Sequence, residues 1–134
     1  MAAGLLLAAA CGHDSPTPTE DITIWQPRGQ WSGRDLLQTD PFISTTGLLR
    51  VTWQTRTLGT AATSGTFRII LHSDVSGRSL TPVAEQTGAG RGVKYISEDP
   101  RSFFLVIDSK GLEWEVDVAE GIAATRKEAT GLRR

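Results

Sequence analysis

Residues suited to acid–base catalysis are scarce in this chain, which has only two histidines. His13 lies in a polar, proline-containing stretch. His72 is followed by Ser73 and Asp74, but neighbouring residues on a strand point to opposite faces, so this string is not a catalytic triad. General acid–base catalysis needs a base within hydrogen-bond reach of its partner. We therefore expect no catalytic residues and no enzyme, with a hydrolase as a remote alternative.

The sequence contains no complete motif for a phosphate-binding or a metal-binding site. The stretch Gly88–Gly92 has the glycines of a phosphate loop. No helix start or Lys-Ser or Lys-Thr pair follows it, however, and we interpret it as a hairpin loop. Several acidic residues could meet at one end of a sandwich, but their spacing matches no defined calcium loop. They are Asp40, Asp74, Glu98, Asp99 and Asp108. We expect no metal and no other cofactor.

Two tryptophans are the best candidates for contact with a ligand. Trp25 and Trp31 flank the stretch 26–30, whose proline and glycine are typical of a turn. An exposed tryptophan beside an arginine could stack on a sugar ring or anchor a partner protein. The alternative is that Trp25 closes one open end of a sandwich. The candidate ligand-binding residues are Trp25, Trp31, Arg28 and Arg34.

The elements that would position these residues are strands, because the chain from Asp21 onward alternates apolar and polar residues. In Leu112–Val118, apolar residues alternate with acidic ones, which predicts one buried face and one wet face. Leu49–Thr55 and Thr66–His72 alternate similarly. Ser102–Asp108 is almost continuously apolar, which predicts a central strand. Weaker strands are predicted at 22–26, 36–44, 80–86 and 93–97.

These patterns predict an all-β fold. About seven or eight short strands in roughly one hundred residues favour a single antiparallel β-sandwich over a barrel with a cavity. We expect flexible N- and C-terminal tails around it. Trp53 and Trp114 should contribute to the core, and Pro82 should confine its strand to an edge or a strand end. Residues 119–128 carry the one weak helical pattern.

The length of 134 residues is typical of one domain with short appendages. With 14 basic and 15 acidic residues, the formal net charge is −1. No basic field is therefore present to attract nucleic acid, which we exclude as a partner. Basic residues do cluster near the C-terminus, at 126–134, as is typical of a solvated tail.

The N-terminal residues are typical of an exported protein. Leu5–Leu7 and Ala8–Ala10 form an apolar run that ends in small residues, as a signal peptide does at its cleavage site. Cys11 follows and is the only cysteine, so it cannot form an intramolecular disulfide. Gly12–Glu20 is polar and interrupted by prolines, as a tether is. The alternative is a cytosolic protein in which Cys11 is a small core residue.

This N-terminus resembles that of bacterial lipoprotein precursors, in which the residues before an invariant cysteine are removed and the cysteine is acylated. The resemblance implies a signal peptide over residues 1–10 and a lipid such as palmitate on Cys11. Residues 11–20 would then tether a domain, residues 21–120, to a membrane, and residues 121–134 would form a tail. Two or three acyl chains would anchor the protein stably. We expect it in the bacterial cell envelope, facing the periplasm or the exterior.

The order of features from Trp31 to Glu120 resembles an extracellular bacterial domain of the jelly-roll or CUB-like kind. The motifs that carry this resemblance are Leu49-Val51-Trp53, Gly65-Thr66-Phe67, Phe103-Phe104-Leu105-Val106 and Trp114. Such domains accompany exported proteins as binding or accessory parts. We therefore expect a non-enzymatic, membrane-anchored module for a protein or a carbohydrate. The alternative is a structural or assembly lipoprotein of the envelope without a small-molecule ligand.

Overall fold

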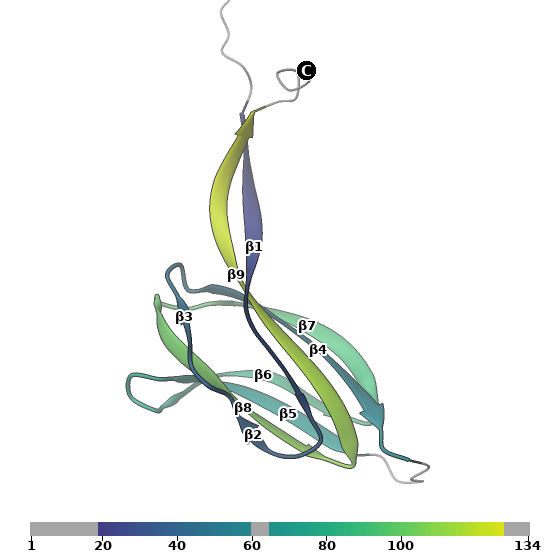
Figure 1. Ribbon diagram of the computed structural model, residues 1–134. Helices are drawn as coiled ribbons and strands as arrows, with labels where there is room; N and C mark the ends of the chain where they lie inside the picture. The colour runs from purple at the N-terminus through teal and green to yellow at the C-terminus, as the bar shows by residue number, and fades with distance from the viewer. Residues whose placement is uncertain (1–18, 60–64, 128–134) are drawn as a thin grey trace, which may run out of the picture. The chain divides into compact units, whose positions relative to one another are not determined.

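The computed structural model describes residues 19–59 and 65–127, and over these two ranges it contains nine strands and no helix (Figure 1). The strands are β1 (Thr19–Gly33), β2 (Leu37–Gln38), β3 (Phe42–Ser44), β4 (Leu48–Thr57), β5 (Thr66–Ser73), β6 (Ser79–Thr87), β7 (Gly90–Ser97), β8 (Arg101–Lys110) and β9 (Leu112–Lys127). The chain divides into two compact units. The larger is Ile24–Ile122, and the described part of the smaller is residues 19–23 and 123–127.

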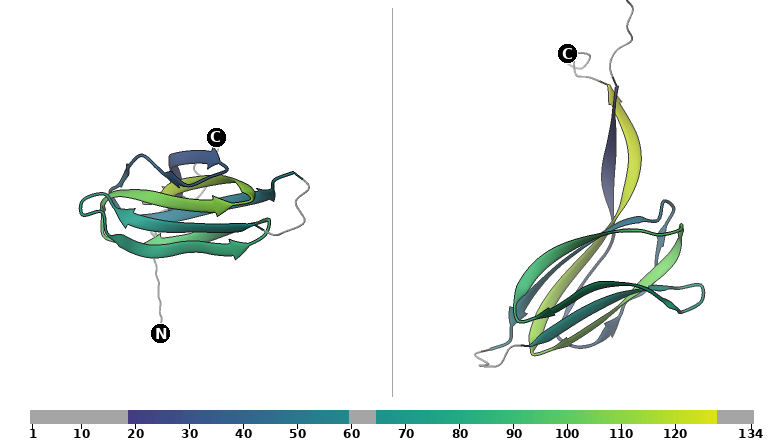
Figure 2. Two further views of the ribbon diagram at one scale, coloured as in Figure 1. Left: turned by 90° about the horizontal axis from the view of Figure 1, so that it is seen from below. Right: turned by 180° about the vertical axis from the view of Figure 1, so that it is seen from behind.

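The strands form two sheets. Sheet A has the order β1-β9-β4-β7, and sheet B has the order β2-β8-β5-β6, with β3 also paired to β8. β4 pairs antiparallel with β7 and β9, and β8 pairs antiparallel with β2, β3 and β5. If β2 and β3 are counted as one interrupted strand, this order is typical of a jelly roll. Figure 2 shows the strands of the larger unit stacked in layers, so the predicted antiparallel β-sandwich is confirmed.

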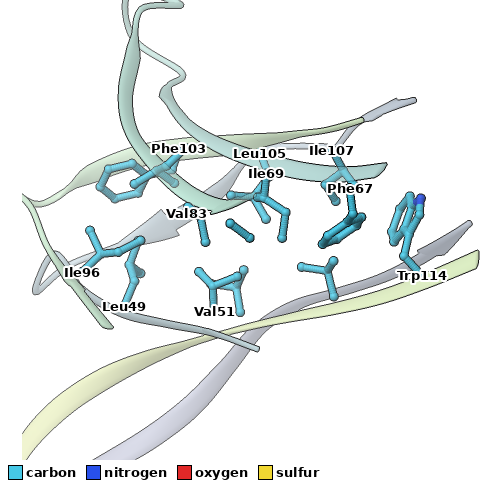
Figure 3. Packing of buried hydrophobic residues seen from close by; sticks show 14 of the residues in the cluster. Leu49, Val51, Phe67, Ile69, Val83, Ile96, Phe103, Leu105, Ile107 and Trp114 are labelled. Carbon is cyan, nitrogen blue, oxygen red and sulfur yellow. The ribbon is translucent and has the colours of Figure 1, made fainter. Parts of the chain in front are cut away.

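The core fills the space between the sheets (Figure 3). Leu49 and Val51 of β4 are fully buried, as are Ile69 and Leu71 of β5. The predicted alternation along these strands is therefore confirmed: apolar residues take the inward positions of the pleat, and within the predicted stretches the outward positions are polar except for Ile70 of β5. β9 follows the same rule, and its buried apolar residues are Leu112, Trp114, Val116 and Val118.

The positions of two strands within sheet B also confirm predictions made from the sequence. β8 lies between β5 and the short strands β2 and β3, which confirms that the most apolar run is central. β6, which contains Pro82, is an edge strand. Its register with β5 shifts between Ile69 and Ile70, where Pro82 stands opposite Ile70. A proline cannot donate a ladder hydrogen bond, so an edge accommodates it at little cost.

Several local predictions differ from the structure. Residues 19–20, which we expected in the tether, begin β1, and residues 90–92, which we expected in a hairpin loop, begin β7. Residues 119–127 continue β9 rather than forming a helix, because sheet A pairs this strand with β1 and pairing overrides a weak local pattern. Residues 121–127, which we expected in the C-terminal tail, are therefore strand. Residues 26–30, which we expected as a turn, lie within β1. The expected tails at 1–18 and 128–134 lie outside the described residues.

The described part of the smaller unit contains an ion pair between β1 and β9. Arg126 Nη2 donates to Glu20 Oε1 at 2.8 Å, and both side chains are exposed to solvent. An exposed pair of this kind contributes on the order of 0–1 kcal/mol, so it contributes little to stability.

Candidate binding face

The outward side chains of sheet A form three rows across β9, β4 and β7. In the first row, Arg50 stands between Ala119 and Tyr95. In the second, Thr52 stands between Asp117 and Val93, and in the third, Gln54 stands between Glu115 and Arg91. We call these nine residues, together with Trp25 of β1, the outer face.

One end of the outer face is aromatic. The ring of Trp25 lies 5.7 Å from that of Tyr95, centroid to centroid, with the two planes tilted by 58°. The guanidinium carbon of Arg50 lies 4.7 Å from the Trp25 centroid, within the range of a cation–π contact. Tyr95 is 58% exposed and Val93 is 48% exposed, although both are large and apolar. These residues therefore present apolar surface to solvent.

The sequence of β9 explains how Trp25 reaches across the sheet. β9 lies between β1, which carries Trp25, and β4, which carries Arg50. In the row of Arg50, the β9 residue is Ala119, whose methyl group leaves room above the sheet. A larger side chain at this position would obstruct the indole ring. Trp25 and Ala119 accordingly line the same hollow.

Two shallow hollows open on this face. One, of about 500 Å³, is lined by Trp25, Arg28 and Arg50 among other residues. The second, of about 330 Å³, is lined by Gln54, Arg91 and Glu115 among others. Thr52 and Asp117 line both, so the two hollows adjoin. The outer face thus combines the exposed ring of Tyr95 and the half-buried ring of Trp25 with carboxylates, an amide and guanidinium groups on one sheet.

The four candidate residues named from the sequence do not gather at one place. Trp25 and Arg28 line the larger hollow. Trp31 packs against the core, with its ring 5.9 Å from Phe42, and its Nε1 donates to Asp40 Oδ1 at 2.9 Å. Arg34 is exposed just after β1 and lines neither hollow. The residues that sequence reasoning missed are Arg50, Tyr95, Glu115 and Asp117.

Beside the larger hollow, Arg28 is held by a buried carboxylate. Its Nη2 lies 2.8 Å from Oε1 of Glu120, whose side chain is fully buried. The other oxygen, Oε2, accepts hydrogen bonds from the loop at 44–46. The donors are the hydroxyl of Ser44 and both the backbone N–H and the hydroxyl of Thr45 and Thr46. We call Glu120, Arg28 and Ser44–Thr46 the carboxylate cluster.

The carboxylate cluster keeps Glu120 ionised. Burial raises the pKa of Glu120, but the hydrogen bonds from Thr46, Ser44 and Arg28 outweigh burial and lower it from the ordinary 4.5 to about 2. The loop closes tightly because Gly47 has φ of 76°, and a Cβ there would lie 1.7 Å from the carbonyl oxygen of Glu98. Since every group in the cluster is already paired, we assign it a structural role.

Residues with catalytic potential elsewhere are engaged in structural contacts. The His72 ring stacks on Phe104 at 4.9 Å, with its Nδ1 3.2 Å from the carbonyl oxygen of Gly77. Ser73 is buried and its Oγ accepts from the N–H of Val75. Asp74 accepts a hydrogen bond from Ser102. Among residues 19–59 and 65–127, no three His, Cys, Asp or Glu side chains are grouped as a metal site would require.

The predictions for the N-terminus concern residues outside the described ranges. Cys11, the predicted site of lipid attachment, lies there, as do the predicted signal peptide and most of the predicted tether. Within the part of the chain that the structure describes, no helix is long and apolar enough to cross a bilayer.

Comparisons with known proteins give little further information. No protein-family model and no curated protein matches the chain. Among solved structures, the T13 particle of infectious bursal disease virus has 13% identity and a TM-score of 0.41, with 84% of this chain and 35% of that chain covered. The Gx strain of this virus has 13% identity, a TM-score of 0.38 and coverages of 84% and 37%. The structure of the Gt strain has 16% identity and a TM-score of 0.33, with 93% of this chain and 39% of that chain covered. This chain therefore spans less than two-fifths of each viral chain, and likeness at this level carries no argument about function.

Proposed function

We propose that this chain is a non-enzymatic binding module of the bacterial cell envelope, which holds carbohydrate on the outer face and is anchored through a lipid on Cys11. The observation that supports carbohydrate binding is the placement of Trp25 and Tyr95 on the same face of sheet A as Asp117 and Glu115. Aromatic rings pack against the C–H groups of a sugar ring, while carboxylates accept hydrogen bonds from its hydroxyls. The jelly-roll strand order also suits the extracellular, CUB-like class that the sequence resembles.

A protein ligand explains this face less well than a sugar does. The buried centre of a protein–protein interface is usually depleted of charged residues. Here Asp117, Glu115 and Arg91 occupy the second and third rows of the outer face. A protein partner would have to desolvate them, at considerable cost unless each were paired. Sugar hydroxyls can bind the same groups while leaving them hydrated. The two carboxylates of the outer face balance its two guanidinium groups, so it presents no net positive charge to attract the phosphates of a nucleic acid.

Glycan binding should depend on Trp25. We expect wild-type protein to bind at least one glucose, N-acetylglucosamine or galactose polymer on an array. We expect Trp25→Ala to weaken that binding at least tenfold, which corresponds to about 1.4 kcal/mol. His72→Ala is the matched control, because it removes a half-buried ring from sheet B, away from the outer face. Wild-type binding that Trp25→Ala leaves unchanged would refute the outer face as the site.

The lipid anchor has its own test. The protein recovered from a bacterial membrane fraction should have an intact mass equal to the chain from Cys11 plus two or three acyl chains. Cys11→Ser should abolish that modification and shift the protein to the soluble fraction. The proposed lipid is attached through the sulfur of Cys11, and serine has no sulfur. An unmodified chain that retains Met1 and stays soluble would overturn the lipoprotein proposal.

A second candidate function is assembly with a partner protein through a sheet edge. β7 is an edge strand of sheet A, and it carries the exposed Val93 and Tyr95. Exposed edges can accept an added strand from another chain. However, Lys94 is also exposed on β7, and a lysine on an edge strand discourages such pairing. A silent glycan array together with one reproducible co-purifying protein would favour this second function.

A further inference from the structure

The outer face changes its chemistry along the strands. Its first row, together with Trp25, is aromatic and carries Tyr95 and Arg50. Its third row is polar and carries Glu115, Gln54 and Arg91 side by side on three neighbouring strands. We call these the aromatic end and the polar end. At the aromatic end, Trp25 and Arg50 line the larger hollow, and the three residues of the polar end line the smaller one.

The distance between the two ends exceeds the size of one sugar ring. Outward positions on a strand recur every second residue, or roughly every 7 Å. Arg50 and Gln54 lie four positions apart on β4, so the rows at the two ends are separated by roughly 13 to 14 Å. A single pyranose can occupy one end but cannot contact both.

The second row connects the two ends. Asp117 and Thr52 line both hollows, so a ligand can extend from one hollow to the other over these side chains. At the aromatic end, Tyr95 is 58% exposed and can pack on the C–H face of a ring. At the polar end, Gln54 lies between the acceptor Glu115 and the donor Arg91. A sugar hydroxyl both donates and accepts hydrogen bonds, so a ring placed there can engage both neighbours.

The geometry points to an oligosaccharide of at least three consecutive units as the ligand, with one terminal ring on the aromatic end, the other on the polar end and the middle ring over Asp117. The outer face is the surface of a sheet rather than a pocket between loops. A chain that lies flat fits it best. β-Linked glucose or N-acetylglucosamine units form such a chain and present C–H groups on both faces of each ring. This inference rests on the proposed carbohydrate function.

Titration calorimetry with saccharides of one to four units tests the inference. The probes are cello-oligosaccharides and chito-oligosaccharides, with malto-oligosaccharides as a curved, α-linked comparison. We expect at least a tenfold gain in affinity from one unit to three in a β-linked series, and a weaker gain in the α-linked series. We expect Asp117→Asn to reduce the affinity for the trisaccharide at least fivefold. Asp108→Asn, which changes another exposed carboxylate, on β8 of sheet B, should leave it unchanged.

The possible failures can be distinguished. A monosaccharide that binds as tightly as its trisaccharide would overturn the inference but leave carbohydrate binding intact. If affinity increased with chain length as much in the α-linked series as in a β-linked one, the assignment of a flat, β-linked chain would be overturned. If no saccharide of any series bound to folded wild-type protein, the proposed function would fail and the inference with it. Amide chemical shifts give an independent readout: a bound tetrasaccharide should perturb β4, β7 and β9 from the first row to the third, but not β5 or β8.

Discussion

Replacing Trp114 with alanine is expected to unfold much of the domain at 37 °C. Trp114 is 1% exposed and is among the largest fully buried side chains. Its ring lies against Gly33 of β1, where a Cβ would come within 3.0 Å of it, and its Nε1 donates to the carbonyl oxygen of Asp35 at 3.3 Å. Truncating a buried tryptophan to alanine costs about 3–5 kcal/mol, a large part of the 5–15 kcal/mol that stabilises a typical domain.

Thermal unfolding followed by circular dichroism measures this effect. We expect a decrease in Tm of roughly 15–30 °C for Trp114→Ala. Trp114→Phe should recover a large part of the loss, because it refills most of the cavity. Trp25→Ala removes the same side-chain type from the outer face and should lower the Tm much less. An unchanged Tm for Trp114→Ala would refute the placement of this residue in the core.

The strands with a clean period of two were predictable from the sequence alone. In β9, the spacing of Leu112, Trp114 and Val116 matches the pleat, so the sequence itself determines which side is buried. β4 and β5 follow the same rule. Pro82 placed β6 at an edge for a purely local reason, namely the missing N–H. These features need no knowledge of which strands are neighbours.

The course of β1 was not predictable in this way. Pro27 and Gly29 are typical of a turn, yet both lie inside the strand. A Cβ on Gly29 would come within 2.2 Å of the ring of Trp31, so packing, rather than backbone reversal, explains the glycine. Because β1 pairs with β9 from the far end of the chain, a window around residue 27 contains no information about the pairing.

The candidate site was only partly predictable, because a local stretch of sequence does not show which strands are neighbours. Trp25 stood out because it flanks the turn-like stretch 26–30 rather than lying in an obvious core strand. Its neighbours Arg50 and Tyr95 come from β4 and β7, which are adjacent only because of the strand order of sheet A. A signal was nevertheless present in β7: Val93 and Tyr95 are apolar, and they share a face with Arg91. Apolar residues on a wet face indicate a surface with a binding role.

Replacing Glu120 with glutamine is expected to destabilise the domain by about 3–5 kcal/mol, because it breaks a buried ion pair while leaving its partners in place. Both oxygens of Glu120 accept hydrogen bonds, Oε1 from Arg28 and Oε2 from the loop. Glutamine has one acceptor oxygen and one donor nitrogen. Whichever way its amide is oriented, an N–H group faces either Arg28 or the N–H of Thr46, and that group is left unsatisfied.

Glu113→Gln is the matched control for this substitution. Glu113 lies on the same strand and also pairs with an arginine, Arg56, at 2.9 Å, but its side chain is 37% exposed. Exposed ion pairs contribute about 0–1 kcal/mol, so the two glutamine variants should differ several-fold in their effect on the free energy of unfolding. Equal effects would show that the carboxylate cluster contributes no more than a surface pair.

The pH dependence of the free energy of unfolding separates the contribution of the charge of Glu120 from that of its shape. Because its pKa is lowered from 4.5 to about 2 in the folded protein, the carboxylate stabilises the fold fully above pH 4.5. This stabilisation, about 3 kcal/mol, should be lost as the pH falls from 4.5 towards 2. Glu120→Gln carries no proton to titrate, so the difference in free energy of unfolding between wild type and variant, measured with urea, should shrink over this range. A difference that stays constant from pH 7 to pH 2.5 would mean that the loop at 44–46 recognises the shape of the side chain and not its charge.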